Sequence, residues 1–127
     1  MKIRKGFVTN SSSSSFIIAR KNKVNEKRLN YCILVSNVLD EIIKESEYYD
    51  LSDKVIKFLE IENIDKAKEQ LAYEITKKLL NKEPDIQLDN EWNINGGEVS
   101  NETDSPIDMF IFLMGHLILD DFKLTTI

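Results

Sequence analysis

The sequence contains one cysteine, one histidine, two prolines and four glycines, and these scarcities exclude several classes of protein. A single thiol, Cys32, cannot close an internal disulfide, so the chain is not a disulfide-stabilised secreted scaffold. One histidine and one cysteine are too few for a zinc site of the usual kind. No apolar run reaches about 18 residues, so we expect no membrane-spanning helix.

What is present is the composition of a globular protein. Hydrophobic residues make up 42% and charged residues 31% of the 127 positions, which is typical of neither a disordered nor a fibrous chain. A chain of this length buries roughly two-thirds of its unfolded surface, enough for a hydrophobic core. The basic start, residues 1–5, is not followed by the apolar segment of a signal peptide. We therefore expect a single domain, residues 1–127, in the cytoplasm.

The net charge of -5 is unevenly distributed, with +7 over residues 1–28 and -12 over residues 29–127. Two interpretations remain open. The oppositely charged parts neutralise each other within one fold, or the first part forms a basic face directed at nucleic acid or at an acidic partner. The acidic remainder repels phosphate, which argues against non-specific binding of nucleic acid.

The amino-terminal residues have the pattern of two short strands. Residues 2–8 alternate in polarity, and residues 14–20 end in a run of strand-forming side chains. A polar loop with five serines separates them. This pattern predicts a β-hairpin or two adjacent strands.

Helical spacing dominates the middle of the chain. Asn25 is a candidate N-cap for a helix that continues to about residue 48, and Ser52 is a candidate cap for a second helix. Apolar residues four positions apart, from Ala67 to Leu79, predict a third helix.

The carboxy-terminal third mixes strand and helix signals. Residues 85–94 predict a strand, the pair Gly96-Gly97 predicts a turn, and residues 98–104 have the composition of an acidic loop. Ser105 and Pro106 are a favourable helix start. Residues 106–119 are apolar on all sides, which fits a buried helix or a buried strand.

Residues 122–127 are a possible final strand. Together these elements predict an α+β domain. Its sheet would be small, either mixed or antiparallel, and would pack with three to four helices.

The most distinctive segment is Gly-Phe-Val-Thr-Asn, residues 6–10, followed by five serines and Phe16. With the basic start it resembles the opening shared by many small, otherwise dissimilar proteins of bacteriophages and their bacterial hosts. The resemblance covers residues 1–18 and departs from the usual pattern only at Thr9, where serine is common. It implies an origin in a phage, a prophage or a mobile element, and it transfers no catalytic residue.

The chemistry of this segment permits several uses. Backbone N–H groups of a serine loop can cradle a phosphate, although the glycines that usually allow close approach are absent. Serines near basic residues suit phosphorylation, and an extended segment can add as a strand to a partner's sheet. An ordinary solvated loop is the remaining interpretation. The candidate binding residues of this region are Arg4, Lys5, Asn10, Ser11, Ser12, Ser13, Ser14, Ser15 and Arg20. Trp92 is a further candidate, because a half-exposed tryptophan can anchor an interface.

No catalytic or metal site is predicted. A serine, His116 and Asp120 or Asp121 would supply the residue types of a triad, but no nucleophile-elbow pattern is present. We expect His116 to be a structural histidine in a core helix and Cys32 to be a buried thiol. The acidic residues near the carboxyl terminus do not have the spacing of a calcium loop.

The sequence therefore favours a non-enzymatic accessory protein, of phage or mobile-element type, that binds another protein of host or phage. It would act as an inhibitor, an adaptor or an assembly component. Faces of opposite charge also favour self-association into homo-oligomers. The alternative is binding of a nucleotide or nucleic acid through the basic strands and the serine loop. We expect no cofactor and no membrane partner.

Overall fold

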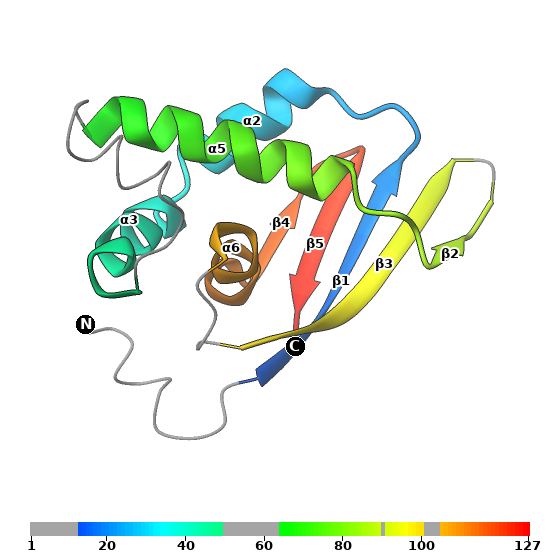
Figure 1. Cartoon of the computed structure of the whole chain (residues 1–127). Coiled ribbons are helices and arrows are strands. Elements are labelled where there is room, and N and C mark those ends of the chain that lie inside the picture. Colours follow the sequence, from blue (N-terminus) through cyan, green and yellow to red (C-terminus); the bar gives the residue numbers. More distant parts are fainter. Residues whose placement is uncertain (1–12, 50–63, 90, 101–104) are drawn as a thin grey trace.

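The computed structural model describes residues 13–49, 64–89, 91–100 and 105–127 (Figure 1). In chain order the elements are β1 (Ser13–Lys21), α2 (Glu26–Leu34), α3 (Val38–Tyr49), α5 (Ile64–Leu80), β2 (Ile86–Gln87), β3 (Trp92–Ser100), α6 (Pro106–Met114), β4 (His116–Ile118) and β5 (Phe122–Thr126). The strands form one antiparallel sheet in the order β2-β3-β1-β5-β4. The predicted α+β class, with an antiparallel sheet packed against four helices, is confirmed.

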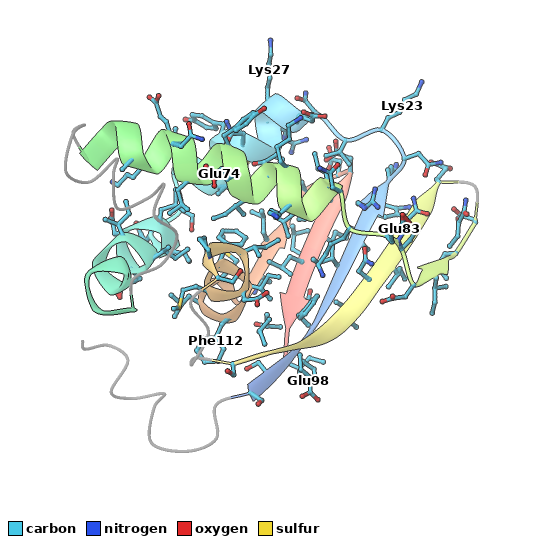
Figure 2. The ribbon with its side chains drawn as sticks, viewed as in Figure 1. Lys23, Lys27, Glu74, Glu83, Glu98 and Phe112 are labelled. Atoms are coloured by element: carbon cyan, nitrogen blue, oxygen red, sulfur yellow. The ribbon has the colours of Figure 1, made fainter. Side chains whose placement is uncertain are left out.

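The described helices gather on one side of the sheet, and the hydrophobic core fills the space between the two layers (Figures 1 and 2). Alternate residues of the strands point into this space, as the two-residue period of a strand requires. Phe16 and Ile18 of β1 enter the core beside Phe122 and Leu124 of β5. The helices contribute Phe110 and other fully buried side chains to the same cluster.

Helix α6 packs against the sheet on one side and against α3 and α5 on others. Because it is covered in this way, it can be the most apolar of the described helices. Pro106 occupies its first turn, where a missing N–H costs nothing. The helix ends at Met114 because Gly115 adopts a φ of 78°, from which the chain turns into β4. The segment 106–119 is thus a helix followed by a short strand. The expectation of a buried His116 in a core helix is wrong, because this residue lies exposed in β4.

The helical middle of the chain agrees with the prediction in part. Asn25 caps α2, and its side-chain oxygen accepts a hydrogen bond from the Arg28 N–H at 3.0 Å. The expected single helix to residue 48 is two helices, because α2 ends at Leu34 and the Ser36 hydroxyl accepts the N–H of Val38 at the start of α3. Helix α5 confirms the third predicted helix. The helix expected from Ser52 lies outside the described residues.

Strand β1 is the central strand and uses both of its edges. It pairs with β3 along its whole length and with β5 from Phe16 to Arg20. Both edges of β1 are therefore occupied from Phe16 to Arg20. The first strand of the expected hairpin, residues 2–8, lies outside the described residues. Ser13 and Ser14 belong to the strand rather than to a loop. The final strand is confirmed as β5.

The glycine pair does not form the predicted turn. Gly96 and Gly97 lie within β3, opposite Ile17 and Phe16 of β1, and residues 98–100 continue the strand where an acidic loop was expected. Gly97 serves a close approach instead. An added Cβ at Gly97 would lie 3.1 Å from Cε2 of Phe16, whereas one at Gly96 would meet only the Phe16 carbonyl oxygen at 3.5 Å.

This difference predicts opposite effects of two neighbouring substitutions. Gly97→Ala should lower the free energy of unfolding by about 1 kcal/mol, because the buried Phe16 ring must move. Gly96→Ala should be neutral or stabilise by up to about 1 kcal/mol, because it restricts the unfolded chain without a clash. Denaturant titration of both variants measures the contrast. Equal effects would contradict the packing of Phe16 on Gly97.

Candidate functional site

The sheet surface opposite the helices is the feature that the fold leaves available, and we call it the open face. Because Phe16 and Ile18 point toward the helices, their neighbours Ile17, Ala19 and Lys21 point to the open face. None of the described helices packs on this side (Figure 1).

A row of side chains crosses the open face over all five strands. In the order of the strands it consists of Ile86, Ile94, Ala19, Lys123 and Ile118. The outer two isoleucines are each 56% exposed, and Ile17 in the next row is 46% exposed. A contiguous group of exposed apolar side chains on a sheet is typical of a surface that binds another protein.

Trp92 lies at one end of this face, next to Lys21 on the neighbouring strand. The Nζ atoms of Lys21 and Lys123 lie 5.3 and 5.0 Å from the centroid of the indole ring. Both distances suit a cation–π interaction. Lys21 also forms an ion pair with Glu91 at 3.7 Å. We call this group, Lys21, Trp92 and Lys123, the lysine end of the open face.

The turn that leads into β3 fixes the backbone of Trp92. The carboxylate of Asp89 accepts the N–H of Glu91 at 2.7 Å and the N–H of Trp92 at 3.0 Å. These two backbone hydrogen bonds lower the pKa of Asp89 below its ordinary value. The ionised Asp89 therefore holds the start of β3 in place at neutral pH.

Glu98 lies at the opposite end of the open face, where it pairs in register with Ser15 (Figure 2). Within the described residues, neither Glu98 nor Lys123 has an ion-pair partner. The open face thus carries an unpaired cation near one end and an unpaired anion at the other, with apolar side chains between them.

The candidate residues from the sequence separate between the two faces of β1. Ser13 and Ser15 lie on the open face, as does Trp92 on β3, whereas Ser14 and Arg20 lie on the helix side. Five further candidates fall outside the described residues: Arg4, Lys5, Asn10, Ser11 and Ser12. The strand geometry therefore does not gather the described candidates into one site.

Arg20 lies in a polar layer between the sheet and the connection from α5 to β2. Its Nη2 atom donates to the carbonyl oxygen of Lys82 at 2.5 Å. Nearby, the amide of Asn93 donates to Asn22 at 2.7 Å, and the amide of Asn95 donates to the carbonyl of Glu83. Asn93 and Asn95 are buried. Arg20 thus helps to attach this connection to the sheet, and its guanidinium does not point to the open face.

Cations of the basic amino-terminal region pair with acids of the remainder where the structure describes them. Lys21 pairs with Glu91, and Arg28 lies 3.7 Å from Asp120. Together with the inward position of Arg20, these pairs favour mutual neutralisation over a single basic face in the described part of the region.

The residue types of a triad do not come together. His116 lies exposed in β4, Asp120 pairs with Arg28, and the carboxylate of Asp121 accepts the N–H of Asn25 at 2.9 Å. Within the described ranges there is no group of three metal-ligating side chains. No helix in the described part of the chain is both long enough and apolar enough to cross a membrane.

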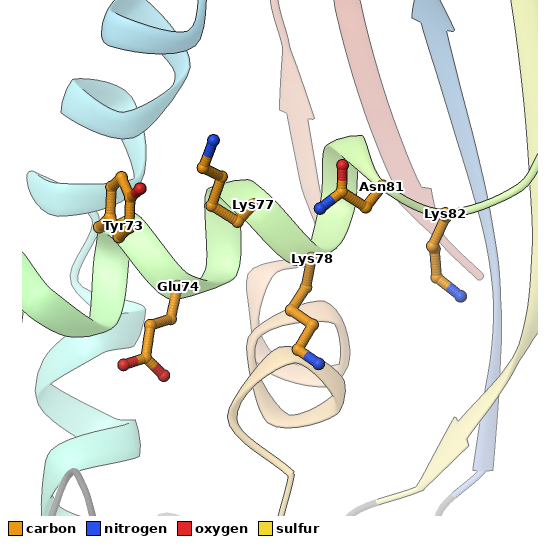
Figure 3. Close-up of a pocket in the computed structure, with 6 residues that line it drawn as sticks. All are labelled: Tyr73, Glu74, Lys77, Lys78, Asn81 and Lys82. Carbon is orange, nitrogen blue, oxygen red and sulfur yellow. The ribbon is translucent and has the colours of Figure 1, made fainter.

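A hollow runs along α5 and the residues after it (Figure 3). It has a volume of about 530 Å³ and is lined by Tyr73, Glu74, Lys77, Lys78, Asn81 and Lys82. Two of its cations are already engaged, since Lys77 lies 3.8 Å from Glu26 and Lys82 lies 5.5 Å from the Phe16 ring. All of these lining residues come from α5 and the two residues after it. Because no second element contributes a side chain to this lining, the hollow is a weaker candidate for a binding site than the open face.

Three described sequence candidates, Ser13, Ser15 and Trp92, lie on the open face, and Trp92 is the one with a large side chain. The sequence reasoning missed Ile17, Ile94, Ile118 and Lys123 as surface residues. A signal was present for Ile17, because two apolar neighbours in one strand, Ile17 and Ile18, must point to opposite faces. Comparison of the chain with protein-family models, with curated proteins and with solved structures finds no match to any of them.

Proposed function

We propose that this protein is a non-enzymatic binding protein whose open face docks another protein. The observation that carries the proposal is the group of apolar side chains on the open face, with Ile17, Ile86 and Ile118 exposed, which no described helix covers. Burial of such side chains stabilises a complex by roughly 25 cal/mol per Å² before the cost of association. The tryptophan between two lysines is suited to anchor the contact, because tryptophan is enriched among residues that dominate binding energy.

The proposal includes an accessory role of phage or mobile-element type. Its support is the resemblance of residues 1–18 to the opening of small phage and host-bacterial proteins. Such a protein would act by occupying or joining a partner, as an inhibitor, an adaptor or an assembly component. The partner would present an apolar surface with at least one carboxylate for the lysine end.

Substitution of Ile17 by lysine tests the proposal. The tagged full-length chain is used to capture proteins from an extract of the organism that encodes it. The wild-type chain should retain a protein in stoichiometric amount, and Ile17→Lys should retain at least tenfold less, because a charge in the centre of an apolar contact is costly to desolvate. Mass spectrometry and densitometry measure the retained protein.

A matched control separates the open face from surface hydrophobicity in general. Val35 is 59% exposed and follows α2, on the helix side of the fold. Val35→Lys introduces the same charge there and should leave capture unchanged. Equal capture by the wild-type chain and Ile17→Lys, with both variants folded by circular dichroism, would refute the use of the open face.

Nucleic-acid binding is the alternative that the same experiment addresses. Half of each extract receives nuclease before capture. Retention that survives nuclease supports a protein partner, whereas retention that disappears with nuclease transfers the proposal to nucleic acid.

A further inference from the structure

On β1 and β3, the open face is complementary to a copy of itself in the sizes of its side chains. Ile18 and its cross-strand neighbours Asn95 and Leu124 form a central row whose side chains point to the helices. On the open face, residues lie at equal distances on either side of this row. On β1 these are Ile17 and Ala19.

The same relation holds on β3, where Ile94 and Gly96 lie on either side of Asn95. A two-fold axis across the strands, at the level of the central row, would set the isoleucines of β1 and β3 over the small residues of the other copy. On β4 the same axis would set Ile118 over His116. Ile17 would face Ala19, and Ile94 would face Gly96, which has no side chain. Large side chains over small ones allow two sheets to pack at about 10 Å, the usual spacing of stacked sheets.

The charges favour the same axis. It brings the lysine end of one copy over Glu98 of the other, because Trp92 and Glu98 are equally far from Asn95 along β3. The contact occurs twice by symmetry, and it supplies an ion-pair partner for Glu98 and Lys123, which have none within the described residues. An axis parallel to the strands would instead stack one lysine end on the other, and the like charges would repel.

We propose that a second copy of this chain docks on the open face, related to the first by a two-fold axis that crosses the strands at the central row. This inference rests on the proposed function, because it names the partner of the same face. The contact is isologous, so each copy contributes the same residues and the assembly closes as a dimer.

The size of the face sets the strength of this dimer. Five strands spaced at about 4.8 Å span about 24 Å, and the six residue steps from Ser15 to Lys21 span about 20 Å. The footprint is therefore on the order of 500 Å² per copy, below the roughly 800 Å² per partner of a standard stable interface. A reversible dimer with a dissociation constant of about 10–100 μM is expected.

Sedimentation velocity of the full-length chain over about 5–500 μM measures this equilibrium. Trp92 is the sole tryptophan, so its fluorescence reports on the open face directly. The wild-type chain should shift from monomer to dimer, with a blue shift of the Trp92 emission over the same concentrations. Gly96→Val, which fills the space that Ile94 of the other copy would occupy, should weaken the dimer at least tenfold.

A charge exchange tests the orientation of the two copies. Glu98→Lys alone and Lys123→Glu alone should each weaken the dimer by about five- to tenfold. The double variant should recover most of the wild-type affinity, because the exchanged charges again face each other across the two-fold axis. Val35→Lys, away from the open face, should leave the equilibrium unchanged.

The outcomes separate this inference from the proposed function. A monomer up to about 500 μM overturns the second copy. If that monomer still captures another protein in an Ile17-dependent way, the proposed function survives. A monomer with Ile17-independent capture overturns both. A dimer that is insensitive to Gly96→Val and to the charge variants uses another surface, and it too overturns the inference.

Discussion

Phe110→Ala is expected to lower the free energy of unfolding by about 3–5 kcal/mol. Phe110 lies in α6, which packs against β3 and β5, and its side chain is fully buried in the core cluster. Removing the ring deletes its apolar surface and leaves a cavity that the neighbours fill only in part. Domains of this size are stable by about 5–15 kcal/mol, so one substitution removes a third or more of the total.

Denaturant titration followed by circular dichroism measures this loss. Tyr73→Ala is the control, because it removes an aromatic ring that is 51% exposed on α5 and should cost less than about 1 kcal/mol. If Phe110→Ala does not fold, Phe110→Leu gives a graded loss of about 1 kcal/mol. Similar losses for Phe110→Ala and Tyr73→Ala would refute the central place of α6 in the core.

The sequence predicted the fold class because the signals that define it are local. Helical spacing, the Asn25 cap and the proline at the start of α6 act within one or two turns, and the structure contains each of them. The wrong prediction of a turn at the glycine pair concerns a contact between distant segments. Gly96-Gly97 has the composition of a turn, but the pair lies in a strand. The ring of Phe16, about 80 positions earlier, packs on Gly97 and leaves no room there for a side chain.

The same distinction explains the candidate site. Trp92 could be chosen from the sequence, because a tryptophan among polar residues is conspicuous. The row that accompanies it draws one residue from each of five strands, and no local pattern reports the order of strands in a sheet. Arg20 is a candidate that the sequence placed wrongly. It belongs to a cluster of basic residues in the sequence, but its side chain and that of Lys21 point to opposite faces of β1.

This position of Arg20 predicts the second large effect. Arg20→Glu should lower the free energy of unfolding by about 2–4 kcal/mol. The guanidinium donates to the carbonyl of Lys82, and no other donor to that oxygen is found within the described residues. A carboxylate there cannot donate, and it would face carbonyl oxygens of the connection after α5, so the polar layer loses a hydrogen bond and gains repulsion.

Lys21→Glu is the matched control, because it reverses the same charge one residue later on the opposite face. Lys21 is partly exposed, and its ion pair with Glu91 is a surface pair. Such pairs contribute about 0–1 kcal/mol, so the loss of stability should be small. The binding measurements should rank the two variants in the reverse order, since Lys21 belongs to the lysine end and Arg20 does not.

The two rankings together decide between a structural and a binding role for Arg20. A basic face used for recognition would make Arg20→Glu and Lys21→Glu similar in binding and leave stability unaffected in both. The structure predicts instead that Arg20→Glu lowers the free energy of unfolding. Its loss of binding should then be no larger than the fraction of the chain that is unfolded. Thermal unfolding and capture, measured on the same preparations, separate the cases. A fully stable Arg20→Glu that no longer binds would return Arg20 to the interface and refute its place in the polar layer.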